Sequence, residues 1–274
     1  MGVIKKPCDH SSNTNMSTSR NILNLMEQHG KTFVKRFSFY LDASDQVLSL
    51  QGKMGLDVAE IQALPEHDQN LIKTYVFLAE SSNTTWSAAL RLLSAGFIAD
   101  VYGLIRILYE TAALLHYGNS APPDTRAELY HSMFKSDLPE AEHRKREWAF
   151  TQKATRLLEQ DNPGLVPVRQ ELNNFGGHIS RAKVMLGNVG ALGNASASRV
   201  FMSGWSDNRY LAGLDVLLTV STLILEEYAV LHDAYGGLSP DMKVRVKGLA
   251  GTFLLTVRPR LQAMMNSGEA RTTP

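Results

Sequence analysis

Apolar residues recur at intervals of three and four along nearly the whole chain, which is the period of an α-helix. Between residues 21 and 50, for example, Ile22, Leu25, Phe33 and Leu41 follow this spacing, with Gly30 as a possible interruption. Alternation with period two, typical of a half-buried strand, is scarcely present. The pattern predicts an all-α fold, a helical bundle of about seven to nine helices.

The segment 84–117 has the strongest pattern, because it lacks proline and is apolar on nearly every side. Its roughly 33 residues would form a rod of about 50 Å. A helix without a wide polar face is typical of the interior of a bundle. We therefore expect one long central helix over about 84–117, which stops at Gly118 ahead of Pro122 and Pro123.

Start and stop signals predict the remaining elements. Helices are expected over about 66–81, 124–134, 140–160, 165–186, 208–235 and from 240 onward, with a long loop at 187–207. Ser239 and Pro240 open the last helix, which Arg258 and Pro259 should kink or end.

The composition fits one domain without extra covalent support. The 274 residues are 44% hydrophobic and carry a formal charge of +1, so the chain can bury a core but has no overall field that attracts nucleic acid or membranes. We expect a single domain over 21–265 between disordered tails at 1–20 and 266–274. The lone cysteine, Cys8, and the absence of a signal sequence or bilayer-length apolar run favour a cytoplasmic protein that does not enter a membrane.

A polar group interrupts the predicted central helix. Arg106 and Glu110 are four residues apart and share a face with apolar surroundings. Because a buried unpaired guanidinium is costly, the two must bind each other or polar groups of another helix. We expect Tyr109, together with Asn174 and His178 from a facing segment, to complete a buried cluster, either structural or at the floor of a ligand cleft.

Two further groups carry candidate chemistry. Arg126 and His131 have the residue types of a metal-independent ribonuclease, although a chain of this composition contains about 1.4 such pairs by chance. The basic residues Arg144, Lys145, Arg146 and Lys153, with Arg156 further on, form either an RNA patch or a solvated face.

Other side chains suggest little specific chemistry. The stripe of Asp215, Thr219, Thr222 and Glu226 predicts a solvated helix face. A di-iron bundle site would need two Glu-x-x-His pairs that face the core, and Glu140 with His143 lies in a heavily charged segment instead. We therefore expect no metal and no cofactor.

The run Ala99 to Glu110 resembles the Arg-x-x-x-Glu helix of uncharacterised bacterial all-helical families related to the HEPN (higher eukaryote and prokaryote nucleotide-binding) superfamily. The later Asn174-Phe175-Gly176-Gly177-His178 resembles their downstream aromatic-small-small-His element, and the resemblance covers about residues 66 to 235. It implies a helical bundle, frequent dimerisation, and RNA cleavage or binding in toxin and phage-defence systems. The HEPN ribonuclease pattern would map onto Arg126 and His131, with Ala127 where a polar residue is usual.

These observations favour a non-catalytic helical binding protein, a homodimer, with a buried Arg106, Glu110 and His178 cluster. In that case, replacing Arg106 with methionine alone should cost several kcal/mol. Two alternatives stay open: a metal-independent ribonuclease and a small-molecule sensor with its pocket under the loop at 187–207.

Overall fold

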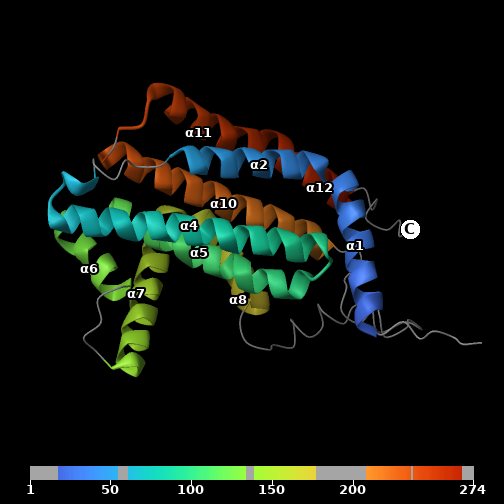
Figure 1. Ribbon diagram of the computed structural model, residues 1–274, viewed down its shortest axis with the longest axis horizontal. Helices are drawn as coiled ribbons and strands as arrows, with labels where there is room; N and C mark the ends of the chain where they lie inside the picture. Colours follow the sequence, from blue (N-terminus) through green and yellow to red (C-terminus); the bar gives the residue numbers. More distant parts are fainter. Residues whose placement is uncertain (1–17, 55–60, 134–138, 177–207, 236, 267–274) are drawn as a thin grey trace, which may run out of the picture.

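The computed structural model describes residues 18–54, 61–133, 139–176, 208–235 and 237–266, and every regular element among them is helical (Figure 1). The elements are α1 (Thr18–Arg36), α2 (Ser38–Lys53), α4 (Glu66–Ser94), α5 (Ile98–Ser120), α6 (Pro123–Met133), α7 (Glu140–Asp161), a 3-10 turn (Pro163–Leu165) leading into α8 (Val166–Gly176), α10 (Asn208–Tyr235), α11 (Pro240–Thr252), a π-helical segment (Phe253–Val257) and α12 (Arg258–Asn266). The all-α prediction is confirmed.

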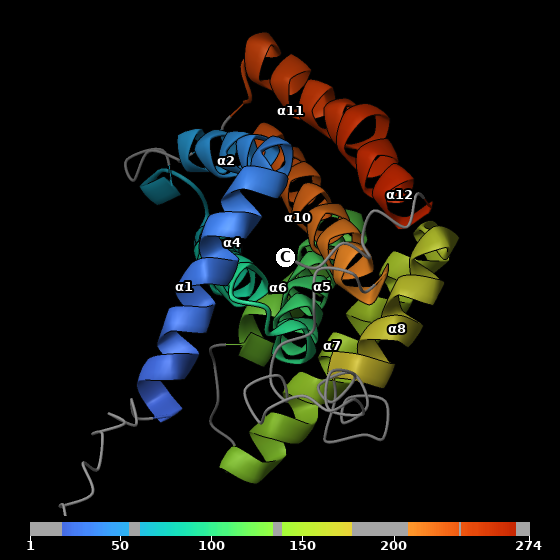
Figure 2. The same cartoon turned by 90° about the vertical axis from the view of Figure 1, so that its right-hand side faces the viewer.

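The helix α5 is the centre of the bundle. It packs against α4, α10, α8 and α7, so it is covered on several sides (Figure 2). Every residue from 111 to 118 is buried. The predicted central position is confirmed, but the first half of α5 is partly solvated, with Asp100 exposed and Ile107 48% exposed.

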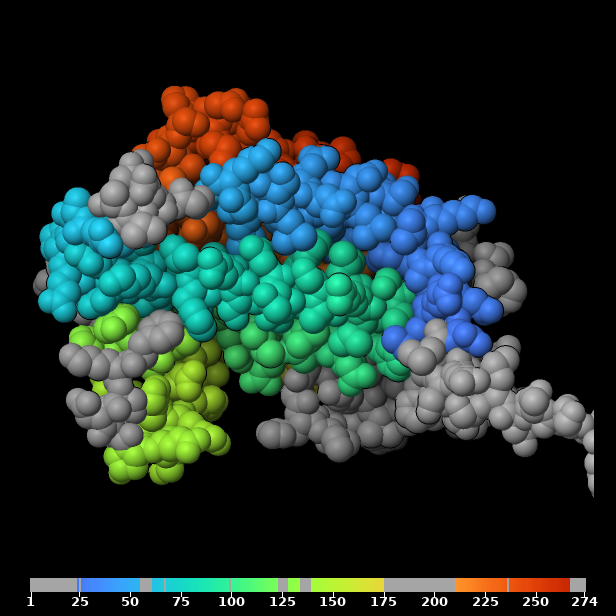
Figure 3. Space-filling model, viewed as in Figure 1, coloured from blue at the N-terminus to red at the C-terminus, as the bar shows by residue number. Residues whose placement is uncertain are grey.

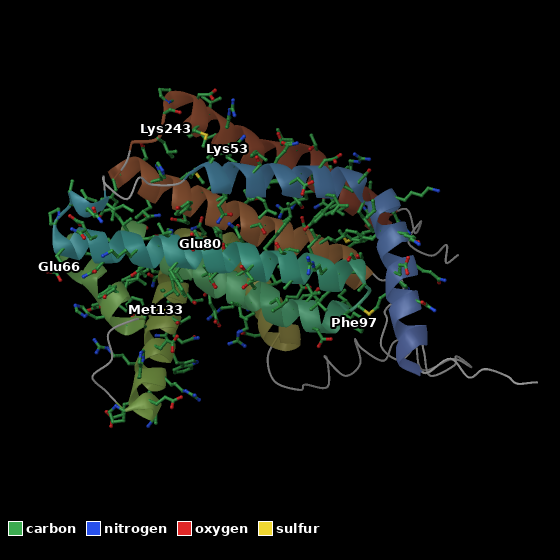
Figure 4. All side chains as sticks on the ribbon, in the orientation of Figure 1. Lys53, Glu66, Glu80, Phe97, Met133 and Lys243 are labelled. Carbon is green, nitrogen blue, oxygen red and sulfur yellow. The ribbon has the colours of Figure 1, made fainter. Side chains whose placement is uncertain are left out.

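The length predicted for this helix is wrong, because 84–117 forms the end of one helix and most of the next. The backbone turns at Gly96, which has a φ of 88°. Its N–H donates to the carbonyl of Leu93 (3.0 Å), and the N–H of Phe97 donates to that of Leu92 (2.9 Å). These two bonds are the Schellman ending of a helix, which favours glycine at the left-handed position. As a result, α4 and α5 form an antiparallel hairpin, with Phe97 at the turn (Figure 4).

The first amphipathic stretch also divides, but at Phe37 rather than at Gly30. Phe37 has a φ of −114° and a ψ of 27°, and it separates α1 from α2. Its side chain is buried against the rings of Phe33 and Tyr210. Packing against a distant helix therefore sets the bend, while α1 continues through Gly30.

Pro259 was expected to kink or end the last rod, which consists of α11, the π-helical segment and α12, and the rod does not end there. A π-helical segment precedes Arg258, and α12 continues through the proline to Asn266. Proline lacks an N–H and its ring crowds the carbonyl four residues earlier, which the wider π-helical turn relieves. No helix in the described part of the chain combines the length and the apolarity needed to cross a bilayer.

Candidate functional site

His116 lies at the centre of a buried charged cluster that joins three helices. Its Nδ1 is 2.7 Å from Glu227 Oε1 on α10, and its Nε2 is 2.8 Å from Asp161 Oδ2 at the end of α7. Asn119 donates to the other Glu227 oxygen (2.7 Å). The hydrogen bond with Glu227 raises the pKa of His116 most, Asp161 adds to the rise, and burial opposes it. With a carboxylate at each ring nitrogen, the geometry favours an imidazolium with both nitrogens protonated.

A second buried cluster contains Tyr109, but not with the partners that were expected. The Tyr109 hydroxyl donates to Glu159 Oε1 (3.1 Å), and Arg169 Nε lies 2.6 Å from the same oxygen. Glu159 is only 8% exposed. Burial, and then the Glu159 charge, raise the pKa of Tyr109. This cluster links α5 to α7 and α8 through a buried carboxylate.

Arg106 and Glu110 bind each other, with 3.0 Å between Nε and Oε1, but each side chain is 33% exposed. The expectation that they are held out of water is therefore wrong. Residues four apart on one helix satisfy each other without a partner from a second helix, so the pair tolerates hydration. Asn174 is exposed on α8, and His178 lies outside the described residues.

Breaking the ion pair between Arg169 and Glu159 should cost more stability than breaking the pair between Arg106 and Glu110. Arg169→Met should lower the free energy of unfolding by about 2 kcal/mol, because it removes the charge partner of a buried carboxylate. Arg106→Met should cost only about 0.5 kcal/mol, since a partly hydrated pair contributes little. Urea unfolding of both variants measures the difference, and equal losses would contradict the burial assigned to Glu159.

Arg126 and His131 both lie on α6. Positions five apart on an α-helix differ by about 140° around its axis, so one straight helix does not bring them to a common face. The His131 ring contacts Tyr130, with centroids 5.8 Å apart. The Arg126 side chain lies outside the described residues, and the ribonuclease pair stays a prediction.

A groove with a volume of about 670 Å³ lies between the end of α5 and one face of α7. Figure 3 shows α6 and α7 projecting from the body formed by α4 and α5. Trp148, which is 65% exposed, lines the groove together with Gln152, Lys153 and Arg156. A tryptophan that is this strongly exposed and lines a groove marks a candidate binding surface.

The predicted basic residues of α7 differ in their pairing. Arg144 binds Glu140, and Lys153 binds Glu128 (2.9 Å) beside the Tyr117 ring. Within the described residues, Lys145 has no ion pair. The ion pairs of Arg144 and Lys153 partly neutralise two of the predicted cations, although both side chains remain exposed.

The sequence interpretation missed Trp148 as a candidate binding residue, although it included Arg156 in the basic group. The spacing of eight residues between the two was a usable signal, since residues on a helix that are seven to eight apart share a face. Trp148 was overlooked because the basic run from 143 to 146 is more conspicuous in the sequence than a tryptophan among polar residues.

The polar stripe of α10, formed by Asp215, Thr219, Thr222 and Glu226, was expected to be a solvated helix face. Instead, it lines a cavity with a volume of about 160 Å³. Arg258 closes one end, where its Nε donates to Asp215 Oδ1 (2.8 Å) and its Nη2 donates to Thr219 Oγ1 (2.5 Å). Phe253 and Leu254 of the π-helical segment form the facing wall. The stripe faces this wall because the last rod packs along α10. The sensor pocket predicted under 187–207 lies outside the described residues.

Within the described residues, no group of three or more His, Cys, Asp or Glu side chains is arranged to hold a metal ion. The described residues therefore offer ion pairs, an exposed aromatic surface and a small cavity as candidate features.

Comparisons with protein family models, curated proteins and solved structures find no match for this chain.

Proposed function

We propose that this protein is a non-catalytic binding protein that holds single-stranded RNA on the groove side of α7. The observation that carries the proposal is the exposed indole of Trp148 between two cations, Lys145 and Arg156, for which the described residues provide no ion pair. Proteins that bind single strands combine aromatic stacking with cations that contact the phosphates.

The spacing along α7 supports this reading. Lys145, Trp148, Gln152 and Arg156 follow intervals of three and four, so they share one face of the helix. The two cations lie about 16 Å apart along the axis. A base stacked on Trp148 would therefore have its flanking phosphates between two positive charges, and the Gln152 amide could bind its edge.

The composition of the groove favours binding over cleavage. Its described lining contains no histidine, aspartate or glutamate, and the two lining residues of other proton-transfer types, Tyr117 and Lys153, both donate to Glu128. A metal-independent ribonuclease needs a group that moves a proton at the reacting phosphate. The link to toxin or phage-defence systems remains a prediction from the HEPN resemblance.

Self-association belongs to the same proposal. Val244 and Leu255 are exposed on the outer side of the last rod, and the intervening Gly248 has open space around it. Their spacing places them on one stripe, which suits the close packing of two helices. The molar mass in solution, measured by light scattering, distinguishes a homodimer from a monomer.

Fluorescence anisotropy with a labelled oligoadenylate tests the RNA site. Trp148→Ala should weaken binding about tenfold, because one stacked base contributes about 1–3 kcal/mol. Arg156→Ala should weaken it and lower the salt dependence by about one phosphate contact. Lys73→Ala, which removes an exposed cation on α4, should leave binding unchanged. Equal affinities for Trp148→Ala and Lys73→Ala would exclude the groove as the site.

Incubation with labelled RNA in EDTA separates the binding protein from the ribonuclease. We expect the wild type and the double variant Arg126→Ala/His131→Ala to show the same background cleavage. Cleavage by the wild type that the double variant loses would replace this proposal with the ribonuclease alternative.

A further inference from the structure

The cavity beside α10 has unused hydrogen-bond acceptors at one end. The Thr222 hydroxyl donates to the carbonyl of Leu218 (2.9 Å), and the Asn162 amide donates to that of Leu158 (3.2 Å). Both side chains line the cavity, and each keeps an oxygen that can accept. No hydrogen bond or ion pair holds the Glu226 carboxylate among the described residues. The end therefore offers three acceptors to a ligand.

The same end carries an excess of negative charge. Asn162 and Glu226 are each adjacent in sequence to a carboxylate that binds His116, namely Asp161 and Glu227. Those two carboxylates outnumber the one imidazolium, and Glu226 adds a further negative charge. Partial burial and the Glu227 charge raise the pKa of Glu226, as expected where negative charges gather. The site therefore favours a cation.

The rest of the cavity is neutral or apolar. At the far end, the charge of Arg258 is matched by Asp215 at 2.8 Å. The apolar part of the lining includes Leu218, Phe253 and Leu254. A cavity of about 150 Å³ accommodates benzene, so the volume of about 160 Å³ fits an apolar body of that size.

We propose that this cavity binds a small primary amine with an apolar body about the size of a benzene ring. An ammonium group has three N–H donors and one positive charge, which match the three acceptors of Glu226, Thr222 and Asn162. The apolar body contacts the π-helical segment. The site is separate from the groove on α7, and its test does not depend on RNA binding.

Nitrogen-15 NMR of the full chain, titrated with benzylamine, tests this site against the neutral isostere benzyl alcohol. Benzylamine should bind with saturable shifts on α10 and on residues 250–258, and benzyl alcohol at least tenfold more weakly. Glu226→Gln should weaken benzylamine about tenfold, the effect of losing one charge-assisted contact, and leave benzyl alcohol unchanged. Glu66→Gln removes an exposed carboxylate at the end of α4 (Figure 4) and should change neither affinity.

A second variant tests the location by volume rather than charge. Ala250 lines the cavity, and Ala250→Met should fill it and abolish binding of both probes. Since Glu226 is an exposed residue, Glu226→Gln should fold even if the filled variant does not. The proposal is overturned if benzylamine gives no saturable shifts at millimolar concentration, or if Glu226→Gln binds it as tightly as the wild type.

Discussion

Replacing His116 with leucine should lower the free energy of unfolding by about 3 kcal/mol near pH 6, because it leaves a buried carboxylate without its cation. Glu227 is the partner that matters, since its side chain is 13% exposed, whereas that of Asp161 is 48% exposed. Urea unfolding measures the loss. His131→Leu serves as the control, because His131 contacts a tyrosine ring and has no carboxylate partner among the described contacts, and it should cost about 0.5 kcal/mol.

The effect of His116 should depend on pH with a definite sign. Its pKa in the folded protein is raised above the ordinary value of about 6.5, mainly by the hydrogen bond with Glu227. The folded state therefore holds the proton more tightly than the unfolded state, and the stabilisation is complete below about pH 6.5. It is lost as the pH rises through the folded-state pKa. The difference in stability between the wild type and His116→Leu should accordingly shrink in alkaline solution, and a constant or growing difference would contradict the ion pairs.

The helical fold could be predicted from the sequence, because burial of one helix face imposes a spacing of three to four residues between apolar positions. The turn at Gly96 was not, because the apolar pattern continues across it, with Leu93 and Ile98 both buried on either side. Glycine alone is no signal for a turn in this segment. Gly103 and Gly118 lie in the same run and remain helical. Only the pairing of α4 with α5 decides which glycine adopts a positive φ.

The polar clusters show a similar division between local and distant information. The spacing of Arg106 and Glu110 was readable, yet each side chain of that pair is 33% exposed, whereas the side chain of Glu159 is only 8% exposed. Tyr109 and His116 bind carboxylates that lie 50 and 111 residues away along the chain. Such partners follow from the packing of α7 and α10 against α5, which helical periodicity does not specify.

Gly118→Ala should be the other strongly destabilising change, with a loss of about 3 kcal/mol. A Cβ atom at this position would lie 1.4 Å from the Tyr75 hydroxyl oxygen and 2.3 Å from its Cζ. Tyr75 is fully buried on α4, so its ring has no free space into which to move, and α4 and α5 must separate. Overpacking of this kind outweighs the gain of about 1 kcal/mol that alanine brings to a helix.

The matched control for Gly118→Ala is the same substitution at Gly30, which is also helical but has no atom within 4 Å of an added Cβ. Gly30→Ala should stabilise the protein by about 0.5–1 kcal/mol, because alanine loses less backbone entropy on folding. Tyr75→Phe combined with Gly118→Ala should recover only part of the loss, since Cζ remains too close. Urea midpoints followed by circular dichroism distinguish these outcomes. If Gly118→Ala and Gly30→Ala shifted the midpoint in the same direction, the close approach of α4 and α5 at Gly118 would be wrong. The tight packing of these two helices beside His116, two residues before Gly118, would then be wrong as well.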